Sequence, residues 1–503
     1  MSKVLVIVCP FMEPYRPPLS AAIVCEVSRL AGHEVVGIDL NIELYHLVGP
    51  KKFHELEMDY AYNTDYVWEG MDAYLESQMK DLGSYDHILI SVFSFFGYGL
   101  AKTLCKFIKD RCSTPILLGG PAVRFPMNDS TMLGLVNESY KEDRSIGAYL
   151  RAKGLIDDYI VGEGEIALAE FFKGNKTFPG INNQDSQQID DLENLPIPNY
   201  DYFDLSRYDY LRGKPDIIML GSRGCVKKCT FCDVSQLWPK YRYRSGNSLA
   251  KEMIMHYERY GVTDFYLADS LINGSIKAFN ELLEALVKYD TKKIFRWGGM
   301  AILRPKNQHV KEMYDMIAET GTSFWIVGVE TFVERVRYEM GKRFSNDDLM
   351  YHLEQSTRIG LENVFLMMTT WPSETLAEHE ENINFYPKLK KYIANGSLLS
   401  MNTHSRLLAI EGTSMIKQLG LTFNDPVLQK LGLPREAFWH SPTNPELTMK
   451  ERIRRSLNVV KASYDNKLLP LQLDSTLLDI SKFVDLIKEH PELEIKPNDQ
   501  SHI

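Results

Sequence analysis

The strongest constraint on the fold is an alternation of short apolar runs with amphipathic, helix-like stretches. It occurs twice along the 503 residues, first up to about residue 175 and again from about residue 216. A continuous apolar run such as Val4–Val8 is typical of a parallel strand that helices cover on both faces. Strands that alternate with helices in this way predict α/β architecture with parallel sheets.

The first series predicts a doubly wound domain over residues 1–175. Four more strands are expected after the first, at Glu34–Ile38, His87–Val92, Pro115–Leu118 and Tyr159–Val161. Residues 45–85 are rich in tyrosine and acidic residues, do not follow the alternation, and are interpreted as an insertion. Domains of this class bind their ligands at the carboxyl ends of the strands.

The second series predicts a partial (β/α)6 barrel of the TIM type over residues 216–420. Six strands are expected, at Ile217–Leu220, Asp264–Ala268, Phe295–Gly298, Phe324–Val329, Asn363–Met368 and Leu398–Asn402. Such barrels carry their chemistry at the carboxyl ends of the strands. The polar, proline-rich residues 176–215 are interpreted as a linker, and residues 421–503 as a mixed, mainly helical C-terminal region.

The charge and hydropathy of the chain limit its partners. The net charge is -10, which does not favour non-specific binding to nucleic acid. No apolar run reaches the roughly 18–20 residues that a membrane span needs, and the first strand is too short for a signal peptide. The sequence therefore predicts a cytoplasmic chain without a membrane partner. A basic helix expected near Lys450–Lys461 is interpreted as a solvated face rather than as a nucleic-acid-binding module.

Three of the seven cysteines are clustered. Cys225, Cys229 and Cys232 follow the first strand of the second series with the spacing C-x3-C-x2-C, whereas the other four are scattered among apolar residues. A structural zinc site normally has four ligands, so zinc here needs a distant residue such as His256. A [4Fe–4S] cluster on three cysteines keeps one iron open for a substrate or cofactor. The spacing therefore favours a cluster, and the odd cysteine count speaks against a disulfide framework.

The segment Gly221–Cys232, with Lys227, Lys228 and the aromatic Phe231 before its last cysteine, resembles the radical S-adenosylmethionine (SAM) superfamily. The resemblance implies that the three cysteines bind a [4Fe–4S] cluster and that SAM chelates the fourth iron. Reduction of SAM then yields a 5′-deoxyadenosyl radical, which abstracts hydrogen from the substrate. It also implies an external one-electron reductant of the flavodoxin or ferredoxin type.

Further positions carry the resemblance at the expected strand ends. It implies that Glu330, Asp269, Gly298 and Gly299 contact SAM or the substrate. Asn402 and His404, at the end of the sixth strand, are the candidate catalytic residues. The segment Trp371-Pro372-Ser373-Glu374-Thr375 departs from the Gly-Pro-Gly-Glu-Thr form of relatives, which puts a close backbone approach to the cofactor there in doubt.

The first domain resembles the Rossmann-like cobalamin (B12)-binding domain that precedes many radical SAM barrels. The resemblance is carried by Pro17-Pro18-Leu19, Gly32-His33-Glu34, Asp39-Leu40-Asn41, Ser91-Val92-Phe93-Ser94, Gly119-Gly120-Pro121 and Gly162-Glu163-Gly164-Glu165. It implies a cobalamin site at Ser91, Ser94, Gly119, Gly120, Gly162 and Glu163. Residues 9–14 contain no histidine for the cobalt. A degenerate domain that only covers the barrel is the alternative.

Together the two resemblances cover roughly residues 1–415 and imply methyl transfer to an unactivated carbon of a small-molecule or peptide substrate. Radical cyclisation, rearrangement and tRNA modification are alternatives within the superfamily. An alternative of another class is a non-catalytic iron–sulfur sensor or electron carrier. An open iron speaks against a carrier. No motif in residues 45–85 or 421–503 identifies the substrate.

Overall fold

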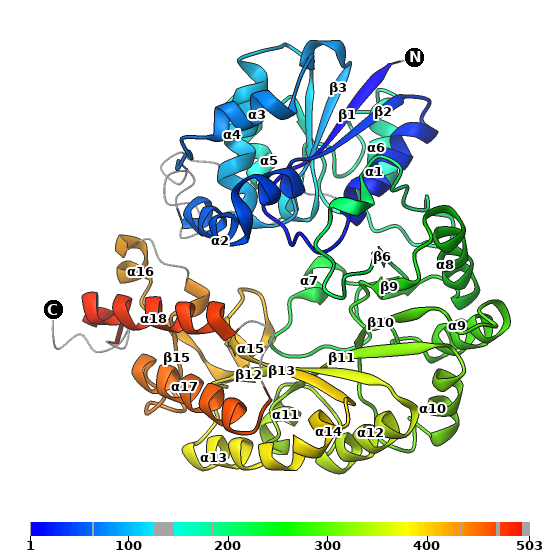
Figure 1. Ribbon diagram of the computed structural model, residues 1–503. Coiled ribbons are helices and arrows are strands. Elements are labelled where there is room, and N and C mark those ends of the chain that lie inside the picture. The colour runs from blue at the N-terminus through cyan, green and yellow to red at the C-terminus, as the bar shows by residue number, and fades with distance from the viewer. Residues whose placement is uncertain are drawn as a thin grey trace. The chain divides into compact units, whose positions relative to one another are not determined.

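The computed structural model divides the chain into two compact units, Met1–Ile218 and Met219–Ile503. The elements of both units are labelled in Figure 1. No helix of the described part is long and apolar enough to cross a membrane. The described residues are 2–62, 65–124, 145–183, 186–431, 435–468 and 473–494.

Unit 1 contains a five-stranded parallel sheet with the order β2-β1-β3-β4-β5. The strand order reverses between β1 and β3, which is where doubly wound domains form their ligand crevice. The prediction of a doubly wound domain is confirmed. The strands are β1 (Lys3–Val8), β2 (Glu34–Asp39), β3 (His87–Ser91), β4 (Ile116–Gly119) and β5 (Asp158–Tyr159).

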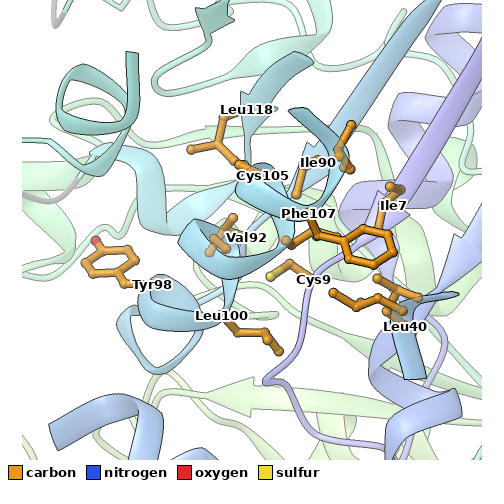
Figure 2. Packing of buried hydrophobic residues seen from close by; sticks show 14 of the residues in the cluster. Ile7, Cys9, Leu40, Ile90, Val92, Tyr98, Leu100, Cys105, Phe107 and Leu118 are labelled. Atoms are coloured by element: carbon orange, nitrogen blue, oxygen red, sulfur yellow. The ribbon is translucent and has the colours of Figure 1, made fainter. Parts of the chain in front are cut away.

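The helices of unit 1 bury apolar residues against this sheet. Figure 2 shows Ile7 and Ile90 of two neighbouring strands with Leu100 and Phe107 of α4. Residues 45–85 form most of two helices, and Phe53 belongs to the same buried cluster. The helices are α1 (Leu19–Leu30), α2 (Leu40–Tyr62), α3 (Met71–Gln78), α4 (Tyr98–Lys109), α5 (Ile146–Ala152) and α6 (Gly164–Phe172).

Unit 2 is built on a six-stranded sheet with the order β13-β12-β11-β10-β9-β6. The pairs from β9 to β13 are parallel, as the partial-barrel prediction requires. The division between the units falls inside β6. The strands are β6 (Asp216–Met219), β9 (Asp264–Leu267), β10 (Arg296–Ala301), β11 (Thr322–Glu330), β12 (Glu362–Thr369) and β13 (Leu398–Arg406).

Helices cover one face of the second sheet, as Figure 1 shows for α8, α9, α10 and α12. Trp325 faces these helices and stacks on His352 of α12 with ring centroids 5.3 Å apart. Because side chains alternate along a strand, its neighbour Ile326 points to the other face and is only half-buried. The helices are α8 (Gly246–Tyr260), α9 (Ile276–Tyr289), α10 (Lys311–Ala318), α11 (Glu334–Glu339), α12 (Asn346–Ile359), α13 (Leu376–Asn384) and α14 (Lys390–Ala394).

The C-terminal region is mainly helical, as predicted, and its basic helix exposes Lys450, Arg454 and Lys461 to solvent, whereas two of its arginines are buried. Arg452 stacks on the ring of Trp439 at 3.8 Å, and Arg455 is 2% exposed. Both guanidinium groups therefore serve internal contacts, which spacing alone did not reveal. The elements are α15 (Ser414–Leu419), α16 (Asp425–Leu431), α17 (Met449–Asp465), α18 (Leu473–Glu489) and the antiparallel pair β14 (Thr422–Phe423) and β15 (Trp439–His440).

The approach of α8 to α9 predicts a large effect of one methyl group. A Cβ at Gly246 would lie 2.1 Å from the Leu282 nitrogen and 2.5 Å from the Ala278 oxygen. We expect Gly246→Ala to lower the free energy of unfolding by about 1–3 kcal/mol, because overpacking outweighs the gain in helix propensity. Urea denaturation measures the change. Gly83→Ala is the control, since a Cβ there meets nothing within 4 Å, and an equal loss in both variants would contradict the prediction.

Candidate functional site

The clustered cysteines lie on a loop that a short hairpin closes. The loop leaves β6, and its ends pair as β7 (Ser222–Arg223) and β8 (Arg242–Tyr243) in antiparallel register. Gly224 has φ +83°, and a Cβ there would lie 2.5 Å from the Lys240 oxygen. Only glycine fits this crossing easily. The loop therefore starts and ends together at the carboxyl end of the first barrel strand.

The three thiols are half-buried and unpaired by disulfides. Burial raises the pKa of Cys225, Cys229 and Cys232, while the positive charge of Lys342 opposes that rise at all three. The backbone N–H of Lys227 donates to Cys225 Sγ at 3.3 Å. Cations and a backbone donor near buried sulfurs stabilise thiolates, which are the form that binds metal. The loop therefore has the donor chemistry that an anionic cluster needs.

The zinc alternative receives no support from His256. Its ring is fully buried in α8, stacked on Tyr260 and 3.6 Å from the Glu252 carboxylate. Within the described ranges, no three His, Cys, Asp or Glu side chains converge on a point where one metal ion would sit. An iron–sulfur cluster makes a different demand, since each cysteine binds a different iron atom. Three thiols on one loop fit that demand.

Glu330 ends β11 and forms an ion pair that the sequence analysis did not foresee. Its Oε1 lies 2.7 Å from Nζ of Lys342, which also donates to the Gly328 oxygen at 2.8 Å. Burial opposes the charge of Lys342, but Glu330 and Cys229 raise its pKa above the usual value. Glu330 has φ +65°, a conformation that is uncommon for a non-glycine residue. The site thus contains a half-buried cation beside the thiols.

Lys342 was missed because no local signal marks it. It lies 12 residues after Glu330, in a turn between α11 and α12. Its side chain is half-buried against Glu330, but this burial is not visible in the segment Met340-Gly341-Lys342. Only the pairing with the end of β11 identifies it.

Asp269 acts on the start of the cysteine loop. It follows β9, is 6% exposed, and accepts a hydrogen bond from the Gly221 nitrogen at 2.8 Å. Burial raises its pKa to about 6, while the hydrogen bond from the Gly221 nitrogen acts in the opposite direction. Asp269 also lines a small pocket together with Tyr241 and Arg244. Its observed contacts hold the loop, and a contact to SAM or substrate stays a prediction.

Gly298 and Gly299 do not end their strand, which corrects the expected position. β10 continues to Ala301. A Cβ at Gly298 would lie 1.9 Å from the Phe324 oxygen, and one at Gly299 would lie 2.2 Å from the Leu267 oxygen. The neighbouring strands therefore leave no space for side chains. Close strand packing accounts for glycine at both positions, and a contact of either residue with SAM or substrate stays a prediction.

The candidate catalytic residues lie on β13. Asn402 pairs in register with Leu366 of β12. Its Oδ1 is buried and has no hydrogen-bond partner among the described residues. A buried amide oxygen without a donor is costly, so Asn402 is available to a ligand. His404 is part of β13, but its side chain lies outside what the structure describes.

In unit 1, four predicted cobalamin-binding residues lie at or just after the carboxyl ends of the neighbouring strands β3 and β4. Ser91 ends β3 and pairs with Gly119 at the end of β4, while Ser94 and Gly120 follow shortly after. Among the described residues, none lies within 4 Å of the place that a Cβ at Gly119 would take. At Gly120, which has φ +109°, a Cβ would lie 2.4 Å from the Val92 oxygen. Gly119 therefore borders open space, whereas Gly120 serves the turn.

The other two predicted residues of unit 1 are engaged with their own chain. Gly162 follows β5 with φ +84°, and a Cβ there would lie 2.5 Å from Ser186 Oγ. Glu163 precedes α6, and its Oε2 accepts a hydrogen bond from the Ile189 nitrogen at 2.9 Å. The structure places both at the carboxyl end of the edge strand, with local partners.

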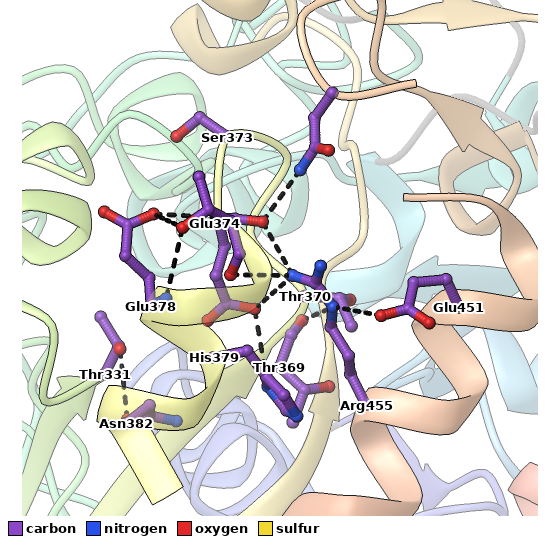
Figure 3. Close-up of polar contacts among 12 residues, drawn as sticks. Thr331, Thr369, Thr370, Ser373, Glu374, Glu378, His379, Asn382, Glu451 and Arg455 are labelled. Atoms are coloured by element: carbon purple, nitrogen blue, oxygen red, sulfur yellow. Dashed lines mark hydrogen bonds and ion pairs between the residues drawn. The ribbon is translucent and has the colours of Figure 1, made fainter. Parts of the chain in front are cut away.

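The Trp371–Thr375 segment is held by a buried polar network, shown in Figure 3. Nη1 of Arg455 in α17 donates to the Glu374 backbone oxygen at 2.7 Å and lies 3.2 Å from its Oε2. Nε of the same arginine donates to Glu451 at 2.8 Å. Burial raises the pKa of Glu374 to about 7, although Arg455 lowers it. The glutamate of this segment is thus bound to the C-terminal region.

Glu378 lies one helical turn after Glu374, and its pairing with Arg335 predicts that the protein loses stability in acid. Hydrogen bonds from Arg335 hold its pKa at about 2, with support from the Thr375 N–H at 2.9 Å. A lowered pKa stabilises the fold above the unfolded value, and this contribution is lost as pH falls from about 4.5 to 2. We expect a loss of roughly 1 kcal/mol for this partly exposed pair. Urea titrations at pH 6 and 3 measure it, and Glu378→Gln, which can still cap the helix, should lose less.

The comparisons with known proteins agree with this geometry. Residues 219–386 match the model of the radical SAM superfamily. The anaerobic magnesium-protoporphyrin IX monomethyl ester cyclase of Synechocystis is 23% identical over 256 residues, 47% of this chain and 49% of the relative. The cytidylyl-2-hydroxyethylphosphonate methyltransferase of Streptomyces wedmorensis is 25% identical over 181 residues, 33% of this chain and 32% of the relative. This chain thus spans about half or less of these curated relatives.

Two solved structures share the fold of the chain. The radical SAM methyltransferase TsrM from Kitasatospora setae, with cobalamin and a [4Fe–4S] cluster bound, has a TM-score of 0.62 at 14% identity and covers 97% of this chain and 100% of its own. The cobalamin-dependent SAM radical enzyme OxsB has a TM-score of 0.60 at 14% identity, covering 98% and 71%. At such low sequence identity, these similarities show a shared fold and nothing more. With the family match and the cysteine loop, residues 219–386 form a radical SAM domain.

Proposed function

We propose that this chain is a radical SAM enzyme. The observation that carries the proposal is the loop with three half-buried thiols at the carboxyl end of β6, beside the half-buried cation of Lys342. When bound, the cluster supplies one electron and SAM supplies the 5′-deoxyadenosyl radical. A sensor or electron carrier without turnover needs no open iron, and the three-cysteine loop favours the enzyme.

The residues of the chain divide the work of binding and orientation. Cys225, Cys229 and Cys232 hold three irons, and Lys342 offsets the negative charge of the thiolates. The carboxylate of Glu330 accepts hydrogen bonds from the hydroxyl or ammonium groups of SAM. Asp269 fixes the entry of the loop through the Gly221 nitrogen. Asn402, whose amide oxygen has no partner among the described residues, orients the substrate.

Unit 1 is proposed to bind cobalamin, and the reaction is proposed to be methyl transfer to an unactivated carbon. Support comes from the strand order with its reversal at β1 and β3, from the open space beside Gly119, and from the bound cobalamin named for TsrM and OxsB. Ser91 and Ser94 offer hydroxyl groups at this edge. Gly120 and Gly162 shape it through the backbone, and Glu163 through its side-chain contact with the Ile189 nitrogen. The substrate is a small molecule or peptide, and a flavodoxin- or ferredoxin-type protein in the cytoplasm supplies electrons.

The test begins with oxygen-free purification and reconstitution with iron and sulfide. Optical spectra are recorded with and without hydroxocobalamin, and dithionite and SAM are then added. We expect cluster absorption, retained cobalamin, and 5′-deoxyadenosine by mass spectrometry. Deoxyadenosine without retained cobalamin would overturn the cobalamin proposal alone. Bound zinc without deoxyadenosine would overturn the radical assignment.

Radical cyclisation is the second candidate, because the Synechocystis relative is a cyclase. The two reactions differ in their use of SAM. Methyl transfer produces S-adenosylhomocysteine in addition to deoxyadenosine, whereas cyclisation produces deoxyadenosine without it. Measuring both products with the substrate present separates the candidates.

A further inference from the structure

We propose that Trp371 is a positioning residue for the cysteine loop, which it holds and shields from water through Phe231. The inference rests on the proposed function, since it concerns the surroundings of the cluster. It also assigns a role to the segment that departs from the glycine-rich form of relatives. Trp371 stands where that form has a glycine.

The cysteine loop is fixed at its midpoint by residues far along the chain. The Thr230 nitrogen donates to the Met340 oxygen at 3.0 Å, and the Met415 nitrogen donates to the Thr230 oxygen at 2.9 Å. Thr230 Oγ1 donates to the Glu339 oxygen at 3.3 Å. Because Thr230 directly follows Cys229, these bonds fix the backbone between Cys229 and Cys232. The loop conformation is therefore held by protein contacts in addition to any metal.

Trp371 contacts the residue between these two cysteines. Its ring meets Phe231 edge to face, with centroids 6.2 Å apart and an interplanar angle of 79°. Phe231 is half-buried and packs on a cluster of buried apolar residues that includes Trp371, Met340 and Met415. The same cluster therefore contains Trp371, which contacts Phe231. It also contains Met340 and Met415, whose backbones hydrogen-bond to Thr230. Moving Trp371 disturbs the segment that carries Cys229 and Cys232.

The indole N–H of Trp371 forms no hydrogen bond with the described residues. Trp371 is 2% exposed, and its Nε1 is buried without a hydrogen-bond partner in that part of the chain. An unmade hydrogen bond of a buried donor costs about 1–3 kcal/mol. Replacing Trp371 by phenylalanine removes this cost, which offsets the cost of the small cavity that the smaller ring leaves. Trp439 of the same cluster differs, because its Nε1 donates to the Leu407 oxygen at 3.1 Å. Comparing substitutions of Trp371 and Trp439 therefore separates an effect on protein stability from an effect on the cysteine loop.

The large ring at position 371 excludes water from the side of the loop that holds Phe231. Reduction adds an electron to a cluster that its thiolates already make anionic. Water stabilises the more highly charged reduced form, so a drier environment lowers the reduction potential. A smaller ring admits water and loosens the loop. The reduction potential should then rise, and the cluster should be lost faster in air.

The experiment compares Trp371→Phe with Trp439→Phe in the full chain, reconstituted without oxygen. Redox titration followed by electron paramagnetic resonance measures the midpoint potential, and loss of visible absorbance in air measures cluster lability. We expect Trp371→Phe to shift the potential upward and to speed the loss several-fold, with little change in thermal midpoint. Trp439→Phe should keep both cluster properties and lower the thermal midpoint, because the Leu407 oxygen loses its donor. Trp371→Leu should act as Trp371→Phe does, more strongly.

Two results would overturn the inference. One is a Trp371→Phe protein with the wild-type potential and wild-type cluster lability. The other is a Trp439→Phe protein that changes both properties as much as Trp371→Phe does. A wild-type chain that binds no cluster would instead overturn the proposed function, so the two failures are distinguishable.

Discussion

Replacing Cys225, Cys229 and Cys232 together by alanine should abolish cluster absorption and reduce 5′-deoxyadenosine formation to background. The reason is that the three thiolates are the proposed iron ligands, and the other four cysteines belong to unit 1. Reconstituted protein is assayed for iron, sulfide, visible absorbance and deoxyadenosine. Cobalamin retention should be unchanged, because the predicted cobalamin residues belong to unit 1.

The control for this variant is Cys112→Ala. Cys112 is also a half-buried free cysteine but lies after α4 in unit 1. It should keep the iron content and the activity of the wild type. The loop of the triple variant should remain folded, because the Thr230 hydrogen bonds do not involve thiols. Retention of a full cluster in the triple variant would show that the ligand assignment is wrong.

Replacing Arg455 by methionine should lower the free energy of unfolding of the second unit by about 3–5 kcal/mol. The guanidinium is buried and bonds to Glu374 and Glu451. Its removal leaves the carboxylate of Glu374 buried without its cation. Urea denaturation measures the loss. Arg454→Met is the control, since Arg454 is exposed, bonds only to Glu451 among the described residues, and should cost below about 1 kcal/mol.

The pH dependence of the Arg455→Met variant shows whether its loss of stability comes from the unpaired Glu374 carboxylate or from lost packing. Burial already raises the pKa of Glu374 to about 7 against the opposing charge of Arg455. Without that charge the folded-state pKa rises further, so the folded variant binds a proton more tightly than the unfolded chain does. Its stability should therefore decrease as pH rises above about 4.5. The deficit should be larger at pH 8 than at pH 6, and Glu374→Gln in the same chain should remove most of this difference. A pH-independent deficit would point to lost packing instead.

The sheets and the cysteine loop were predictable because their signals are local. Continuous apolar runs mark covered parallel strands, and the alternation with helices restricts the connections between them. The spacing of Cys225, Cys229 and Cys232 lies within eight residues and needs no distant partner to be recognised. Glu330 was singled out for a similar reason, since it follows an apolar run that becomes β11.

Other features depend on which strands and helices approach one another. Gly298 was expected at the end of its strand, but β10 continues to Ala301 and the Phe324 oxygen of β11 leaves no space for a side chain at Gly298. The basic helix was read as solvated, whereas Arg455 is buried against Glu374, 81 residues earlier in the chain. A sequence shows the charge of an arginine but not the neighbours that remove it from water.

The amino-acid sequence thus establishes the two parallel sheets, the order of their strands along the chain and the candidate iron ligands. These follow from hydrophobic periodicity and from short-range spacing, which are properties of neighbouring residues. The pairing of Lys342 with Glu330, the contact of Trp371 with Phe231 and the burial of Arg455 are established by tertiary packing alone. Each joins residues 12 to 140 or so positions apart, and no local pattern encodes contacts over such separations.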